Sequence, residues 1–81
     1  MDYVEIGTLL TFKGAVSLAY GKDLVMPWRC TYRGAGHYFS SPEILAGYCC
    51  GRGWIQCHRA DDLVAELVEM QKIIDAGIMV F

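Results

Sequence analysis

The clearest periodic pattern in the chain is in residues 61–76, DDLVAELVEMQKIIDA. Apolar residues recur there at steps of three and four, which places them on one face of an α-helix. These apolar residues are Leu63, Leu67, Met70 and Ile74, and the residues opposite them are Glu66, Glu69 and Lys72. Asp61 is suited to cap the N-terminus, and Gly77 supplies the left-handed residue that often follows a helix. The pattern therefore predicts an amphipathic helix with one buried face.

A second helix is indicated by Ser40-Ser41-Pro42-Glu43. Serine is a preferred N-cap residue, and proline is favoured at the first helical position because its missing N–H is not needed there. Gly47 lies inside the segment and Gly51 follows it, so we expect a short helix of about two turns.

The N-terminal third is ambiguous. Residues 3–6 alternate between apolar and polar side chains, as in a strand. Residues 11–20, TFKGAVSLAY, place their apolar side chains at helical spacing, with Thr11 as a candidate N-cap and Gly21 after the last turn. A strand over the same residues is the alternative. We favour the helix.

The remaining segments have extended or turn patterns. Pro27 removes a backbone donor and is typical of an edge strand, so we expect residues 24–32 to form one. Glycines between apolar segments predict a turn at residues 33–36. The other strands are expected at residues 37–40, 53–58 and 78–81.

These elements follow one another in the order β-α-β-β-α-β-α-β. Such an order predicts the α+β class, with a small, mostly antiparallel sheet packed against a long C-terminal amphipathic helix and one or two shorter helices. A chain of 81 residues without a linker or repeat forms one compact domain, residues 1–81.

Composition adds an expectation about partners. Apolar residues make up 54% of the chain, and three Phe, five Tyr and two Trp are present. A core this small cannot hide so much apolar surface, so the surplus is expected at a partner surface or a homodimer contact. No apolar run approaches the roughly 18 residues that a membrane helix needs, and no signal-peptide pattern is present. We therefore expect a cytoplasmic protein without a membrane partner.

Charge is unevenly distributed along the chain. The net charge is −2, which disfavours a general nucleic-acid binder. Residues 22–59 carry five Lys and Arg against two acids, a net charge of +3. Residues 60–81 carry five acids against Lys72, a net charge of −4. The middle of the chain is thus mildly basic, and the acidic last helix is available to a basic partner.

The four cysteines, Cys30, Cys49, Cys50 and Cys57, raise the question of a metal or thiol site. Zinc ligands usually come in pairs two to four residues apart, and this chain has no C-x-x-C. Adjacent residues such as Cys49 and Cys50 point in different directions. Both also lie near the C-terminus of a predicted helix, where the helix dipole disfavours a thiolate.

We therefore expect unpaired cysteines that serve as small buried apolar residues. No other acid–base or nucleophile set can be assembled from the chain. The sequence thus predicts no catalytic residues, no metal and no cofactor, and hence a protein that is not an enzyme.

The basic middle of the chain combines Trp, Tyr and Arg, the residue types enriched at binding hot spots. We expect partner-binding residues at Arg29, Tyr32, Arg33 and Arg52, at least two of them facing solvent. The aromatic rings of Tyr38 and Trp54 are expected in the core.

Two segments, residues 10–28 and 53–66, carry a family resemblance. The first has Thr11-Phe12, Ala15, Gly21-Lys22 and Trp28, and the second has Gly53-Trp54 and Asp62-Leu63-Val64-Ala65. In these features the chain resembles small phage proteins that include the Thoeris anti-defence sponge and an anti-CRISPR protein. About a third of the chain takes part in the resemblance, and it transfers no ligand-binding residue.

The resemblance implies a phage-encoded protein that acts on a bacterial defence system. Our first hypothesis is a non-enzymatic, anti-CRISPR-like inhibitor that contacts a host protein or defence complex stoichiometrically in the host cytoplasm. The alternatives are a zinc-stabilised nucleic-acid-binding module and a nucleotide-signal sponge.

Overall fold

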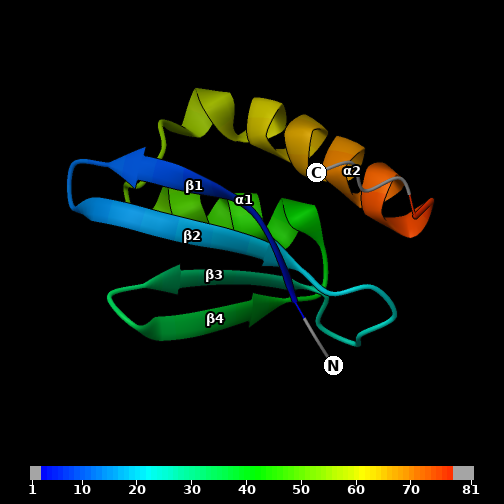
Figure 1. Ribbon diagram of the computed structural model, residues 1–81. Coiled ribbons are helices and arrows are strands. Elements are labelled where there is room, and N and C mark those ends of the chain that lie inside the picture. Colours follow the sequence, from blue (N-terminus) through cyan, green and yellow to red (C-terminus); the bar gives the residue numbers. More distant parts are fainter. Residues whose placement is uncertain (1–2, 78–81) are drawn as a thin grey trace.

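A computed structural model describes residues 3–77 (Figure 1). Four strands come first and two helices follow. The strands are β1 (Val4–Thr11), β2 (Gly14–Tyr20), β3 (Trp28–Tyr32) and β4 (Ala35–Phe39). The helices are α1 (Pro42–Gly51) and α2 (Ala60–Asp75), with a short 3-10 turn, η1 (Cys57–Arg59), before α2. The α+β class is confirmed. The C-terminal helix has 16 residues, an ordinary length rather than a long one.

The sheet is an antiparallel meander in the order β1-β2-β3-β4, so β1 and β4 are its edges. Two residues, Phe12 and Lys13, join β1 to β2, and Thr11 pairs with Gly14 across this turn. Arg33 and Gly34 join β3 to β4 with φ angles of 52° and 81°. Positive φ at both central residues marks a turn whose twist matches that of the flanking strands.

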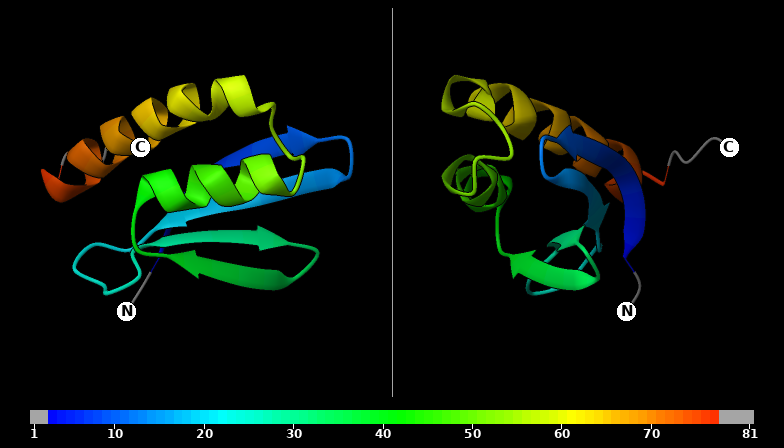
Figure 2. Two further views of the ribbon diagram at one scale, coloured as in Figure 1. Left: turned by 180° about the vertical axis from the view of Figure 1, so that it is seen from behind. Right: turned by 90° about the vertical axis from the view of Figure 1, so that its left-hand side faces the viewer.

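The core lies between one face of the sheet and the two helices. Figure 2 shows both helices on the same side of the curved sheet. Alternate residues of β2 and β3 are buried against them, as expected for a sheet with one covered face. The largest buried side chains on the two strands are those of Val16, Leu18, Tyr20 and Trp28. The helices contribute Leu45, Ala46, Cys49, Leu63, Leu67 and Ile74.

The helix expected over residues 11–20 is wrong, because these residues form the end of β1, the β1–β2 turn and β2. Gly14 has a φ of 126°, which a helix interior does not accommodate. Val16, Leu18 and Tyr20 then point alternately into the core. Burial between β1 and β3 thus overrides the helical spacing, which the same apolar residues also satisfy.

Two other expected strands differ from the structure. Residues 53–58 form a loop and part of η1, so the strand expected there is wrong. The strand expected at residues 24–32 begins only at Trp28, and its expected edge position is wrong, because β3 pairs with both β2 and β4. Pro27 lies before β3 and therefore removes no hydrogen-bond donor from the sheet. The strand expected at residues 78–81 lies outside the described residues.

Both helices begin near the expected positions. The Ser41 hydroxyl accepts a hydrogen bond from the Ile44 N–H at 3.2 Å, and Pro42 follows as the first helical residue. α1 has ten residues despite Gly47, longer than expected. α2 begins at Ala60, so Asp61 lies in its first turn instead of capping it. Gly77 has the expected left-handed φ of 74°.

Candidate binding surface

Three chain connections meet at one end of the molecule, at the left of Figure 1: the β1–β2 turn, the β3–β4 turn and the link from α1 to α2. We call this region, residues 10–14, 32–34 and 52–59, the loop end. It carries four of the seven Lys and Arg residues: Lys13, Arg33, Arg52 and Arg59. The fold therefore gathers on one surface basic residues that are far apart in the sequence.

A continuous aromatic cluster supports this surface. The ring of Trp54 lies 5.1 Å from that of Tyr32 and 5.6 Å from that of Tyr48. The Arg52 guanidinium lies 5.5 Å from the Trp54 ring centroid and 5.9 Å from the Tyr48 centroid, and Arg33 lies 5.2 Å from Tyr32. Both arginines thus make cation–π contacts that hold them at the surface.

A hydrogen bond joins two of the connections. The Tyr32 hydroxyl donates to the Lys13 carbonyl oxygen at 2.8 Å. The β1–β2 turn is therefore positioned next to β3, and its two central residues project from an anchored base.

Two large apolar side chains at the loop end are exposed to solvent. Phe12 is fully exposed at the tip of the β1–β2 turn, and Leu10 is 83% exposed. Beside them is a hollow of about 300 Å³, which Gly53, Trp54 and Gln56 also line. Burying such a side chain in a partner would contribute roughly 1.5–3 kcal/mol. Phe12 is thus a candidate anchor.

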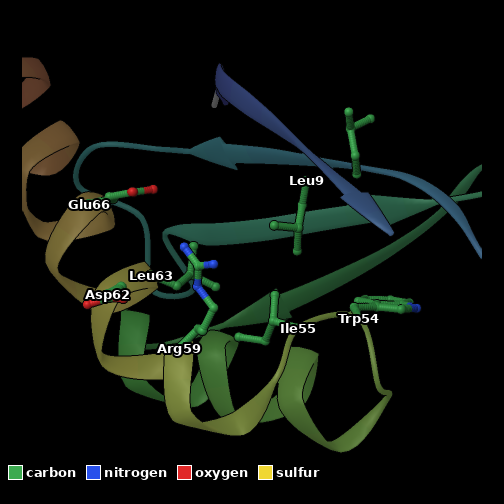
Figure 3. A pocket seen from close by; sticks show the side chains of 8 residues that line it. Leu9, Trp54, Ile55, Arg59, Asp62, Leu63 and Glu66 are labelled. Atoms are coloured by element: carbon green, nitrogen blue, oxygen red, sulfur yellow. The ribbon is translucent and has the colours of Figure 1, made fainter. Parts of the chain in front are cut away.

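A second hollow, of about 240 Å³, opens between the end of β1 and the start of α2. Figure 3 shows Leu9 pointing towards Ile55, with Arg59, Asp62 and Glu66 on the α2 side. The hollow therefore combines an apolar floor with a charged rim.

Trp54 lines both hollows and is only 4% exposed, yet its Nε1 has no hydrogen-bond acceptor among the described residues. A buried donor without an acceptor costs stability.

The structure brings together three of the four partner-binding residues predicted from the sequence. Tyr32, Arg33 and Arg52 lie at the loop end, and both arginines are exposed, so the expected exposure of at least two residues is confirmed. Arg29 lies elsewhere, on the open face of the sheet. Its Nη2 donates to Glu5 Oε2 at 2.8 Å, and its guanidinium lies 4.7 Å from the Tyr3 ring centroid.

The two aromatic residues expected in the core differ in position. Trp54 is buried as expected, whereas Tyr38 is half exposed on the open sheet face, so its expected burial is wrong. Sequence reasoning missed Phe12 as an exposed residue. Its exposure could have been predicted by interpreting Thr11-Phe12-Lys13-Gly14 as a hairpin turn instead of the start of a helix.

Two of the four cysteines form a disulfide, and the other two are free thiols. Cys50 and Cys57 form a disulfide, so the expectation that all four cysteines are unpaired is wrong. The chain reverses after α1 and brings residue 57 back beside residue 50, which the sequence separation alone did not indicate. Cys30 and Cys49 are unpaired and fully buried, as expected.

Burial raises the pKa of both free thiols, and it raises that of Cys49 to about 12, with the neighbouring Cys30 adding to the shift. Both are therefore protonated and inaccessible at neutral pH, unlike the exposed thiolate that nucleophilic catalysis requires. Within residues 3–77, no three Cys, His, Asp or Glu side chains converge as metal ligands.

Comparisons with models of known protein families, with curated proteins and with solved structures found no match. In the part of the chain that the structure describes, no helix has the length and apolar content to cross a membrane.

Proposed function

We propose that this protein is a non-enzymatic binding protein that uses the loop end to contact another protein. The observation that carries the proposal is the full exposure of Phe12 at the tip of an anchored turn, next to Lys13 and within the basic loop end. An exposed aromatic anchor surrounded by arginines is typical of a protein interface centre.

The charges at the loop end favour a partner with an acidic surface. Lys13, Arg33 and Arg52 lie on its turns, and neither arginine forms an ion pair among residues 3–77. A partner carboxylate could therefore pair with either of them without displacing an ion pair within residues 3–77. Asp61 and Asp62 at the start of α2 would oppose a nucleic-acid backbone, which favours a protein over a nucleic acid.

The family resemblance in residues 10–28 and 53–66 suggests which partners to test first. A phage-encoded, anti-CRISPR-like inhibitor would act in the host cytoplasm by stoichiometric contact with a bacterial defence complex. The first segment of the resemblance includes Phe12, and the second includes Trp54. Phe12 is the proposed anchor, and the buried Trp54 ring supports the surface around it.

The test is capture of host proteins from bacterial lysate by the tagged protein, followed by affinity measurement with the purified partner. Phe12→Ser and Arg52→Ala should each weaken binding by about tenfold to a hundredfold, the usual effect of removing an interface anchor. Neither should change the thermal midpoint by more than a few degrees, because both side chains are exposed.

Ile44→Ser is the matched control, because Ile44 is also an exposed apolar residue but lies on α1. Binding that survives both loop-end variants, or that falls equally with Ile44→Ser, would contradict the loop end as the interface. Thermal stabilisation by a cyclic nucleotide would favour the sponge alternative. Stoichiometric zinc together with unfolding in chelator would favour the zinc-module alternative.

A further inference from the structure

A second surface adjoins the loop end and lies between α2 and the edge of β1 that no described strand pairs with. We call it the β1–α2 seam and define it by Ile6, Leu9, Leu63, Glu66, Met70 and Ile73. Three hollows open along it, and neighbouring hollows share lining residues. Leu9 and Leu63 line both the first hollow and the middle one, and Ile6 and Met70 line both the middle hollow and the third. The hollows therefore form one continuous groove.

β1 offers unpaired backbone groups along this groove. It is an edge strand of eight residues that pairs only with β2 within the described chain. In an antiparallel pair, alternate residues turn their N–H and C=O groups away from the neighbouring strand. After a register shift between Glu5 and Gly7, pairing with β2 is regular as far as Thr11.

The edge also lacks most of the features that protect natural edges from pairing with another chain. Lysine, proline and short length are the usual devices, and VEIGTLLT contains neither Lys nor Pro. The part from Gly7 to Thr11 carries no charge. By contrast, the opposite edge strand, β4, has only five residues.

The side chains of the seam combine an apolar floor with an acidic rim. Ile73 is 40% exposed, and Ile6 and Met70 are partly buried. Asp62, Glu66 and Glu69 line the α2 side, and none of these three acids forms an ion pair among residues 3–77. Arg59 at one end is the one basic residue that lines the groove.

We propose that the β1–α2 seam binds an extended segment of a partner protein that carries both apolar and basic side chains on the face turned towards α2. The segment would pair with the β1 edge through its backbone. Every second side chain would then face α2. On that face, apolar side chains would enter the groove over Ile6 and Met70, and Lys or Arg side chains would face Glu66 and Glu69.

Charge complementarity selects this occupant over a second copy of the chain. A two-fold pairing of β1 with its own copy would continue the sheet and bring two α2 helices together on the same face. The acidic rims of both helices would then approach each other, which is unfavourable. A basic segment would instead neutralise the rim.

The probe is the blocked peptide Val-Thr-Lys-Thr-Val-Thr-Lys-Thr, in which Val and Lys share one face of the extended chain. The matched control replaces each Lys with Glu. Titration is followed by backbone amide NMR of the full chain. The basic peptide should shift the β1 signals from Gly7 to Leu10 and slow hydrogen exchange of the amides at the free edge. The acidic peptide should do neither.

Two variants with matched controls locate the site. Glu69→Lys should weaken binding of the basic peptide by about threefold to tenfold, because an attractive pair becomes repulsive. Glu43→Lys, the same change on α1, should leave binding unchanged. Ile73→Asp should also weaken binding, whereas Ile44→Asp should not.

Any of four outcomes would overturn the proposal. Equal binding of both peptides would remove the role of charge. Peptide-induced shifts confined to the Phe12 turn would place binding at the loop end, not the seam. Protection of the β1 edge amides in the protein alone, or self-association that Glu69→Lys strengthens, would show that another part of the chain or a second copy occupies the seam.

Discussion

Trp54 is the residue on which the loop end depends most. Its ring contacts Tyr32, Tyr48 and the Arg52 guanidinium, and it is almost completely buried. Its indole N–H, however, has no acceptor among the described residues. The ring should therefore stabilise the fold while the N–H contributes nothing to it.

Two substitutions separate these contributions. Trp54→Ala should lower the free energy of unfolding by about 3–5 kcal/mol, because a large buried ring is lost. Trp54→Phe should cost clearly less, because most of the ring surface stays and the unpaired donor is removed. Denaturant unfolding of both variants measures the difference. Equal losses would mean that the N–H does have a partner in solution.

The buried thiols of Cys30 and Cys49 should make stability depend on alkaline pH. Burial raises the pKa of each in the folded state, for Cys49 to about 12, whereas an unfolded thiol ionises near about 8.5. The contribution of the two thiols to the free energy of unfolding is therefore complete below about pH 8. Above that pH it declines by about 1.4 kcal/mol per unit for each thiol, until the folded thiol ionises as well.

Urea unfolding at pH 7, 8, 9 and 10 measures this dependence. Cys49→Ala should make the alkaline slope shallower and leave the neutral plateau flat. A constant free energy of unfolding between pH 8 and pH 10 would contradict the assigned burial.

Two glycines, Gly14 after the β1–β2 turn and Gly47 inside α1, have different effects on the elements that contain them. Gly14 has a φ of 126°, so Gly14→Ala should destabilise the protein by about 1–3 kcal/mol through backbone strain. Gly47 is an exposed residue inside α1, and an added Cβ would contact nothing within 4 Å. Gly47→Ala should therefore stabilise the protein by about 0.5–1 kcal/mol. The midpoint of thermal unfolding should fall for Gly14→Ala and rise for Gly47→Ala.

The Cys50–Cys57 disulfide joins the last turn of α1 to η1 and closes the loop that carries Trp54. Its sequence separation is seven residues. Closing a loop of this size should contribute about 2–3 kcal/mol through the unfolded chain. Adding reductant should lower the unfolding midpoint accordingly, and the double variant Cys50→Ser/Cys57→Ser should no longer respond. An unchanged midpoint in the reduced native protein would contradict this contribution.

The whole molecule is electrically polarised. Four of its seven Lys and Arg residues lie at the loop end, whereas the outer side of α2 carries Glu66 and Glu69. At the far end, Lys22 is held by its hydrogen bond to the Asp75 carbonyl oxygen at 3.2 Å. The two proposed surfaces therefore suit partners of opposite charge.

Salt provides a test at this scale. Binding of an acidic partner at the loop end should weaken as NaCl rises, because exposed charges are screened over about 10 Å at 0.1 M. Arg33→Ala with Lys13→Ala should make that dependence shallower, whereas Lys22→Ala with Lys72→Ala should leave it unchanged. An identical slope for both double variants would argue against the loop end.

Elements whose signals are local could be predicted from the amino-acid sequence. Ser41 and Pro42 set the start of α1, the apolar spacing from Leu63 to Ile74 set α2, and the glycines around residue 34 set the β3–β4 turn. In each case neighbouring residues carry the physical cause, namely a cap, a repeat or a backbone angle. The α+β class and two of the exposed arginines followed from the same kind of signal.

Features that depend on residues far apart in the chain could not be predicted from the sequence and are seen only in the folded protein. Residues 11–20 satisfy both a helical and a strand pattern, and pairing with β1 and β3 selected the strand. Such contacts also bring Cys57 back to Cys50, assemble the loop end and leave β1 at the edge of the described sheet. No local pattern encodes these contacts, because their free energy comes from surfaces that meet only after the chain has folded.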